Sequence, residues 1–205
     1  MDNTWDKMFY NRGNLIGGVD EAGVVDIAGP LVAACVVFPK IDIYKEDLRI
    51  FDVNDSKQIP EKYRKQHAEI IWQVAAGIGI GEASPAEIDY LGVNIAKSLA
   101  MLRAVAGCRA SQGRGLHVTP DFLIVDGNRK IQTSIPQKAI IKADTKSLCV
   151  ASASVIAKVY RDEVMIRLHH RFPCYDWISN KGYPCEKHFV GLDQRGAEVG
   201  VHRIK

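Results

Sequence analysis

Four acidic residues each come shortly after an apolar segment of the kind that forms a buried strand: Asp20 and Glu21, Asp126, and Asp144. One acid at a strand end is commonly a turn former or a helix N-cap. In an α/β sheet, however, neighbouring strand ends converge on one edge, where ligands bind. Carboxylates gathered there would repel one another unless cations lay between them, and Mg²⁺ or Mn²⁺ prefers such hard oxygen ligands. The spacing therefore leaves two interpretations, separate turn residues or one divalent-metal site.

A carboxylate-lined metal site would suit the hydrolysis of phosphodiesters. Two ions roughly 3.5–4 Å apart can activate a water and stabilise the leaving oxygen of an in-line displacement. A polyanionic substrate also needs cations, and four lysines are expected near the same sheet edge or its helix: Lys57, Lys142, Lys146 and Lys158. Each lysine alone is typical of a solvated surface. Their grouping around the carboxylates favours phosphate binding.

The elements that would position these residues are indicated by apolar patterning. Strands are predicted over residues 15–19, 31–38, 75–81, 122–125 and 139–141. Helices are predicted over residues 60–74, 84–102 and 147–169. The second of these begins with a capping-box pattern at residues 84–87. This order of strands and interleaved helices predicts an α/β fold, with helices packed on the faces of a mixed sheet.

The bulk composition excludes several classes of protein. A chain of 205 residues with 47% hydrophobic and 25% charged residues suits one globular domain. No apolar run approaches the roughly 18 residues that span a bilayer, and residues 1–12 do not resemble a signal peptide. Five cysteines without a Cys-x-x-Cys pair argue against a zinc site or a disulfide framework, and favour the cytoplasm. The net charge of +3 is too small to indicate a nucleic-acid partner by itself.

Ordered blocks of sequence resemble the type 2 ribonuclease H (ribonuclease HII) family over nearly the whole chain. Each block alone is weak, but the set is specific. The blocks are Gly18-Val19-Asp20-Glu21-Ala22-Gly23 with residues 28–34, Asp55-Ser56-Lys57, Glu87-Ile88-Asp89 with Asn94-Ile95, Val125-Asp126-Gly127-Asn128, residues 142–147, residues 151–159 with Arg161-Asp162, Lys181-Gly182-Tyr183, His188, and His202-Arg203.

The resemblance implies a single RNase H-like catalytic domain over residues 1–205. Its expected fold is a five-stranded mixed sheet with helices on both faces and a C-terminal helical extension. That extension, from about residue 170 to 205, would contact substrate. The resemblance also implies a cytoplasmic monomer that does not associate with a membrane. The expected activity is endonucleolytic hydrolysis of the RNA strand of RNA–DNA hybrids, or of DNA containing ribonucleotides, leaving 5′-phosphate and 3′-hydroxyl ends.

Residue roles also follow from the resemblance. The catalytic, metal-binding carboxylates would be Asp20, Glu21, Asp126 and Asp144, holding two Mg²⁺ or Mn²⁺ ions. The expected substrate contacts are Gly23, Val24, Val25, Lys57, Lys146 and Tyr183. Tyr183 would stack on the deoxyribose that follows the ribonucleotide, as in family members that recognise an RNA-to-DNA junction. Without the resemblance, the sequence predicts that Tyr183 only closes a packed turn beside Pro184.

One departure from the family concerns substrate preference. Ordinary members have Gly-Arg-Gly-Pro where this chain has Gly23-Val24-Val25-Asp26, so the arginine that reads the 2′-hydroxyl is missing. Asp26 adds an acid where the substrate backbone is expected to pass. Either another residue replaces the arginine, or the preference for single embedded ribonucleotides is altered. Two other functions remain open, a DNA-directed nuclease of the same fold and a protein that binds hybrids without cutting them.

Overall fold

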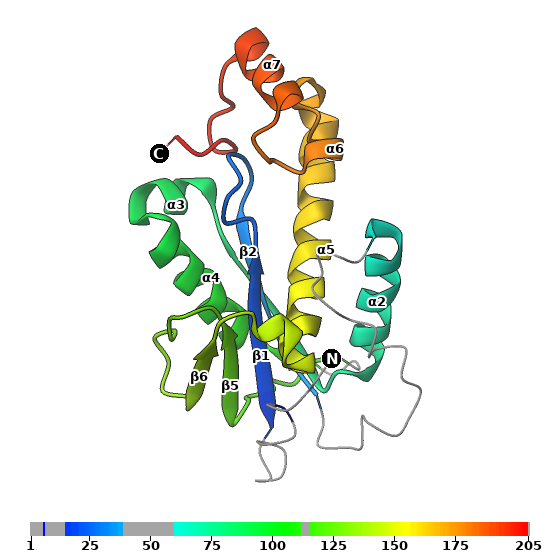
Figure 1. The fold of residues 1–205 in the computed structure, drawn as a ribbon, viewed down its shortest axis with the longest axis vertical. Helices are drawn as coiled ribbons and strands as arrows, with labels where there is room; N and C mark the ends of the chain where they lie inside the picture. Colours follow the sequence, from blue (N-terminus) through cyan, green and yellow to red (C-terminus); the bar gives the residue numbers. More distant parts are fainter. Residues whose placement is uncertain (1–5, 7–14, 39–59, 112–114, 205) are drawn as a thin grey trace.

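The computed structural model describes residue 6 and residues 15–38, 60–111 and 115–204. Its centre is a six-stranded mixed sheet in the order β4-β3-β2-β1-β5-β6 (Figure 1). Neighbouring strands from β4 to β1 are antiparallel, whereas β1, β5 and β6 run parallel. The strands are β1 (Ile16–Ala22), β2 (Leu31–Val37), β3 (Gly77–Ala83), β4 (Arg109–Ala110), β5 (Phe122–Asp126) and β6 (Gln137–Ile140).

Two expectations about the elements need correction. The sheet has six strands rather than five, because the two residues of β4 pair with Gly77 and Ile78 at the edge. So short a strand has no alternation of apolar and polar residues to detect. The single helix expected from residue 84 is divided at Gly92, whose φ of 78° lies outside the helical region.

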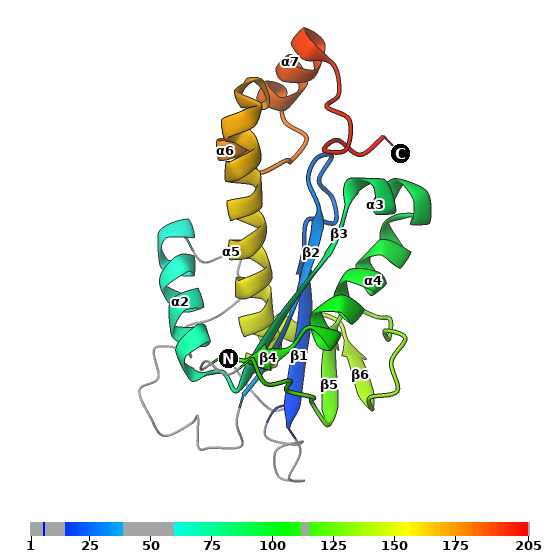
Figure 2. The same cartoon turned by 180° about the vertical axis from the view of Figure 1, so that it is seen from behind.

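Helices cover both faces of the sheet, as the sequence predicted (Figures 1 and 2). They are α2 (Glu61–Val74), α3 (Pro85–Leu91), α4 (Val93–Ala106), α5 (Leu148–Arg171), α6 (Trp177–Asn180) and α7 (Glu186–Arg195). Strand β2 is buried on both sides. Val32 and Val36 pack in the core with α2 and α5, and Leu31 and Cys35 pack in the opposite core with α3 and α4.

The long helix α5 lies close against β1, and this contact sets the positions of the first two acids. A Cβ atom on Gly18 would lie 2.1 Å from the carbonyl carbon of Cys149, so only glycine permits the approach. Side chains alternate between the two faces of a strand. Asp20 therefore lies on the α5 side with Gly18, and Glu21 lies on the α4 side with Val19.

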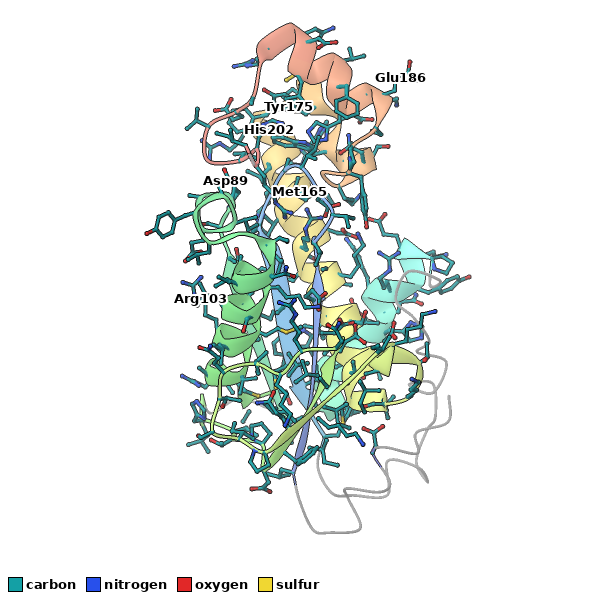
Figure 3. All side chains as sticks on the ribbon, turned by 60° about the vertical axis from the view of Figure 1, so that its left-hand side comes forward. Asp89, Arg103, Met165, Tyr175, Glu186 and His202 are labelled. Carbon is teal, nitrogen blue, oxygen red and sulfur yellow. The ribbon has the colours of Figure 1, made fainter. Side chains whose placement is uncertain are left out.

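The C-terminal segment packs on the far end of α5. Its short 3₁₀ helix η3 (Pro173–Tyr175) leads into α6, and α7 follows. Tyr175 and Trp177 are buried with Met165 of α5, and Figure 3 places Tyr175 beside His202 in this region. Among the residues that the structure describes, no helix is long and apolar enough to cross a membrane.

Candidate metal centre

Three carboxylates meet where β1 and β5 end side by side. Asp20, Glu21 and Asp126 each offer an oxygen, and these oxygens lie within 4.8 Å of one another. The parallel register that pairs Val19 with Val125 brings the acids together. Asp20 and Glu21 lie inside β1, which continues to Ala22, rather than after the strand as the sequence suggested. Convergence at one edge of the sheet is nevertheless what the spacing predicted for these three residues.

Local hydrogen bonds orient two of the three carboxylates, those of Asp20 and Asp126. The Glu21 backbone N–H donates to Asp20 Oδ1 over 2.7 Å. The Ser154 hydroxyl of α5 donates to the Asp20 carboxylate from the helix side. The Ala143 N–H donates to Asp126 Oδ1, also over 2.7 Å. Asp20 and Asp126 are thereby held by backbone N–H groups, and Asp20 also by a side chain of α5.

Electrostatics at this cluster favour the binding of a cation. Burial, with the nearby charges of Glu21 and Asp126, raises the pKa of Asp20 well above its ordinary value. Burial also raises the pKa of Glu21, and Asp126 adds to the effect, although Lys97 opposes it. The Glu21 Oε2 atom is buried and accepts no hydrogen bond from the residues that the structure describes. An all-oxygen donor set with such an atom fits Mg²⁺ or Mn²⁺.

Asp144, the fourth expected ligand, lies outside this group of three. It is half-buried in the 3₁₀ turn η2 (Ala143–Thr145) that follows β6. That turn is tied to the cluster, because its Ala143 N–H is the donor to Asp126. Asp144 therefore lies in the turn adjoining the cluster, and its carboxylate is not within the 4.8 Å group.

The loop after β1 carries the departure from the family pattern. Gly23 has a φ of 94°, and a Cβ atom there would lie 2.2 Å from Arg161 Nε. Val24 is half-buried, whereas Val25 is 68% exposed. The expectation that Asp26 faces the substrate backbone is wrong, because Asp26 is buried and lies 2.7 Å from Arg161 Nη2.

Arg161 connects this loop to the turn before Tyr183, a role that the sequence did not indicate. Its Nε donates to Pro30 O over 3.0 Å, and Nη2 donates to Ala28 O over the same distance. Nη1 donates to Lys181 O over 2.8 Å. One buried guanidinium thus fixes the loop after β1 and the Lys181-Gly182-Tyr183 segment against each other.

Tyr183 presents an accessible ring rather than a wholly packed one. The residue is 40% exposed, and Lys158 Nζ lies 5.7 Å from its ring centroid. Lys158 also donates to Asp162 Oδ1 over 2.8 Å. The ring is therefore available for stacking, beside a cation that is itself held in place.

The other expected phosphate-binding lysines are placed less tightly. Lys146 is exposed in the segment that follows η2, and its Nζ donates to Ile141 O over 2.9 Å. Lys142 is exposed with a left-handed φ of 55°. Lys57 lies outside the described residues.

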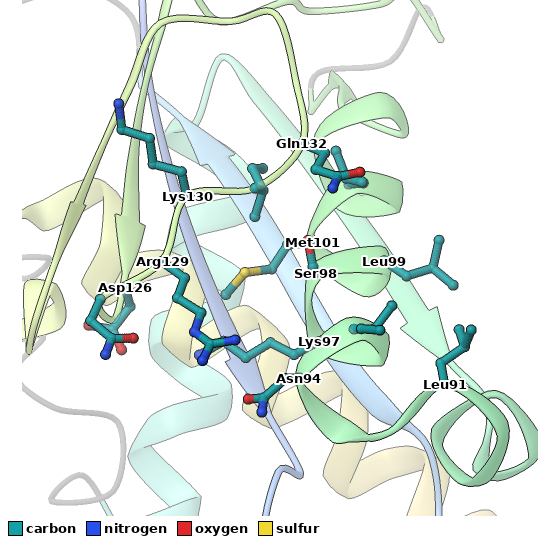
Figure 4. A pocket seen from close by; sticks show the side chains of 14 residues that line it. Leu91, Asn94, Lys97, Ser98, Leu99, Met101, Asp126, Arg129, Lys130 and Gln132 are labelled. Atoms are coloured by element: carbon teal, nitrogen blue, oxygen red, sulfur yellow. The ribbon is translucent and has the colours of Figure 1, made fainter.

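Lys97 of α4 is a residue at the cluster that the sequence reading missed. Its Nζ lies 2.5 Å from Glu21 Oε1, across 76 positions of sequence, so no local pattern marks the pair. Lys97 also lines a groove of about 470 Å³ between α4 and the segment after β5, together with Asp126, Asn128 and Arg129 (Figure 4). The groove adjoins the carboxylates and is bordered by cationic and amide groups.

Comparison with known proteins shows the family of this chain. The family model for ribonuclease HII matches residues 17–205. A ribonuclease HII of Bacteroides fragilis is 44% identical over 197 residues, covering 96% of this chain and 90% of that protein. The ribonuclease H2 structure from Pyrococcus horikoshii superposes with a TM-score of 0.74 at 25% identity, covering 92% of each chain.

A second solved structure, of the PCNA:RNase HII complex from Archaeoglobus fulgidus, superposes with a TM-score of 0.72 at 25% identity. It covers 93% of this chain and 95% of that one. These likenesses confirm the RNase H-like fold. Ribonucleases HII are metal-dependent endoribonucleases that act on RNA–DNA hybrids, and the present chain belongs to the ribonuclease HII family.

Proposed function

We propose that this enzyme hydrolyses the RNA strand of RNA–DNA hybrids with two divalent cations, Mg²⁺ or Mn²⁺, and leaves 5′-phosphate and 3′-hydroxyl ends. The observation that carries the proposal is the convergence of Asp20, Glu21 and Asp126, with oxygens within 4.8 Å of one another. Carboxylates facing a phosphate backbone would weaken binding unless cations were present. Their arrangement is thus suited to catalysis more than to binding alone.

Asp20, Glu21 and Asp126 would hold the cations, and Asp144 would complete the site from the adjoining turn. Bound in such a site, the ions supply an activated water and stabilise the leaving oxygen. The protein supplies the fixed geometry. Because the Ala143 N–H donates to Asp126, the turn η2 is anchored at the cluster, and rotation of the Asp144 side chain would suffice to bring its carboxylate toward the cations.

Substrate binding is assigned to the loop after β1, to Lys57, to Lys146 and to Tyr183. Gly23, Val24 and Val25 would offer backbone groups to the ribonucleotide, and Tyr183 would stack on the sugar that follows it. The support for this assignment is Arg161, which holds the loop and the Tyr183 segment together. A fixed distance between the loop after β1 and Tyr183 would match the distance between a ribonucleotide and the nucleotide that follows it.

The chain is proposed to act as a cytoplasmic monomer with one catalytic domain over residues 1–205. All five cysteines are thiols, as a reducing compartment requires. The C-terminal extension, from about residue 170, would contact substrate through Tyr183. Light scattering on the purified protein would test the monomer, and a dimer mass would exclude it.

Three labelled duplexes test the substrate assignment: a full RNA–DNA hybrid, DNA with one embedded ribonucleotide, and DNA alone. With Mg²⁺ or Mn²⁺, we expect cleavage of the full hybrid and weaker cleavage at the single ribonucleotide, because the loop lacks the usual arginine. Equal cleavage of both ribonucleotide substrates would mean that another group replaces the arginine. Cleavage of DNA alone would identify a DNA-directed nuclease, and binding without cleavage would exclude an enzyme.

A further inference from the structure

Lys97 provides the one cationic contact of Glu21 among the described residues. The ammonium group lies 2.5 Å from Glu21 Oε1, and the two side chains are only 25% and 11% exposed. Water therefore screens the pair weakly. The other oxygen, Oε2, is buried without a hydrogen-bond partner in the described part of the chain.

A divalent cation bound among the three carboxylates would have to share Glu21 with this lysine. Mg²⁺ binds carboxylate oxygens at about 2.0–2.1 Å, so an ion on the unpartnered Oε2 would lie close to the ammonium group on Oε1, and the two positive charges would repel each other. This repulsion favours a shift of whichever cation is held less rigidly. Lys97 has a flexible side chain, whereas the carboxylates are fixed by β1 and β5.

The groove beside the cluster has room for the Lys97 ammonium group once that group has left Glu21. Lys97 extends from α4 toward the carboxylates, and Asn94, Asn128 and Arg129 line the same groove (Figure 4). Amide and guanidinium donors are groups that bind phosphate oxygens. An ammonium group released from Glu21 would add a third kind of donor beside the metal centre.

We propose that Lys97 and the divalent cation compete for Glu21. Lys97 thereby lowers the affinity of the substrate-free protein for metal, and cation binding releases its ammonium group into the groove to bind a substrate phosphate. This inference rests on the metal centre proposed above. It makes Lys97 a substrate-binding residue that couples metal binding to substrate binding.

The test is calorimetric titration of Mn²⁺ into chelator-treated protein at about pH 8, well above the ordinary pKa of carboxyl groups. Lys97→Met should bind the first Mn²⁺ about tenfold more tightly than the unmodified chain, because the competing charge is removed. Lys97→Arg keeps the charge and should stay near the unmodified affinity. Lys130→Met removes a charge from the same groove and should also leave the Mn²⁺ affinity near the original value.

Mn²⁺ binding by Lys97→Met that is equal to or weaker than that of the unmodified chain would overturn the competition, since a merely structural ion pair would loosen the site when lost. At saturating Mn²⁺, Lys97→Met should raise the KM for a hybrid severalfold, and an unchanged KM would overturn the phosphate contact. If even the unmodified chain bound no Mn²⁺, the metal centre itself would be wrong, and this inference with it.

Discussion

The Asp26 carboxylate lies 2.7 Å from the Arg161 guanidinium group, and both side chains are sealed from solvent. Burial raises the pKa of Asp26 despite the opposing charges of Arg161 and Arg203. The contact is an ion pair by distance, because neither Asp26 oxygen accepts a well-directed hydrogen bond from the described residues. Asp26, an acid that departs from the family pattern, is thus buried inside the loop after β1, beside the Arg161 side chain that anchors this loop.

Asp26→Ala should lower the free energy of unfolding by about 3 kcal/mol, because it leaves a buried guanidinium without its counter-charge. Urea unfolding followed by circular dichroism measures the change. Asp193→Asn, at an exposed position of α7, is the matched control and should stay within about 0.5 kcal/mol of the unmodified chain. A loss for Asp26→Ala as small as that of the control would show that the pair contributes nothing.

Val24→Arg should restore discrimination at single embedded ribonucleotides. A guanidinium hydrogen bond to the 2′-hydroxyl contributes about 1.5–3 kcal/mol, which corresponds to about a tenfold or greater gain in kcat/KM for that substrate relative to the full hybrid. The ratio of the two kcat/KM values is the measurement, and Val25→Arg provides the neighbouring control. An unchanged ratio for Val24→Arg would mean that the loop places residue 24 away from the ribose.

Two buried histidines in the C-terminal segment have complementary tautomers. His188 Nδ1 lies 2.9 Å from Tyr183 O, a carbonyl that can only accept, so Nδ1 carries the proton. His188 Nε2 then accepts from Trp177 Nε1 and from His202 Nε2, each at 3.1 Å. The Glu198 N–H donates to His202 Nδ1 over 2.8 Å, which leaves the His202 proton on Nε2. Both rings are therefore neutral.

This arrangement predicts a loss of stability in acid. Burial lowers the pKa of both His188 and His202 below the ordinary value of 6.5. Below that value the unfolded chain binds protons that the folded chain does not, so stability present above pH 6.5 is lost as the pH falls toward the lowered pKa values. Urea unfolding at about pH 7.5 and about pH 5.5 measures this difference.

The variant His202→Gln should reduce that pH dependence, whereas His170→Gln, at an exposed position, should preserve it. Equal pH dependence in His202→Gln and the unmodified chain would contradict the assignment of neutral, titrating rings. The comparison removes the contribution of carboxyl groups, because these are common to all three proteins.

Asp144→Asn should abolish cleavage but weaken the first Mn²⁺ site less than Asp20→Asn does. Asp144 lies outside the group whose oxygens are within 4.8 Å. Its carboxylate would therefore have to move toward that group before it could bind a cation. Cleavage assays and Mn²⁺ calorimetry on both variants give the comparison. Full activity of Asp144→Asn would remove it from the site.

Much of the fold could be predicted because it follows local patterns. The apolar runs before Asp20 and Asp126 marked β1 and β5, and Ser84 with Glu87 marked the start of α3, where both capping-box hydrogen bonds form. The break at Gly92 was missed, since apolar spacing continues across it. The edge strand β4 was missed because its two residues are defined by pairing with β3 alone.

The site was less predictable where it depends on distant pairs. Asp20 and Asp126 could be placed together, because each follows a predicted strand of the sheet; the structure shows that these strands pair in parallel. The contacts from Lys97 to Glu21 and from Arg161 to Asp26 span distant parts of the chain and leave no periodic signal. Asp26 was misplaced for the same reason, since nothing near it in sequence reveals a buried arginine.

The most direct test of the metal-dependent ribonuclease is the cleavage of a labelled RNA–DNA hybrid by Asp20→Asn, compared with the unmodified chain and with Asp193→Asn. All three are assayed with Mg²⁺ or Mn²⁺, and circular dichroism checks the fold. We predict cleavage by the unmodified chain and by Asp193→Asn, its loss on chelation, and no cleavage by a folded Asp20→Asn. Cleavage by Asp20→Asn at the rate of the unmodified chain would contradict the assignment of Asp20, Glu21 and Asp126 as the metal centre.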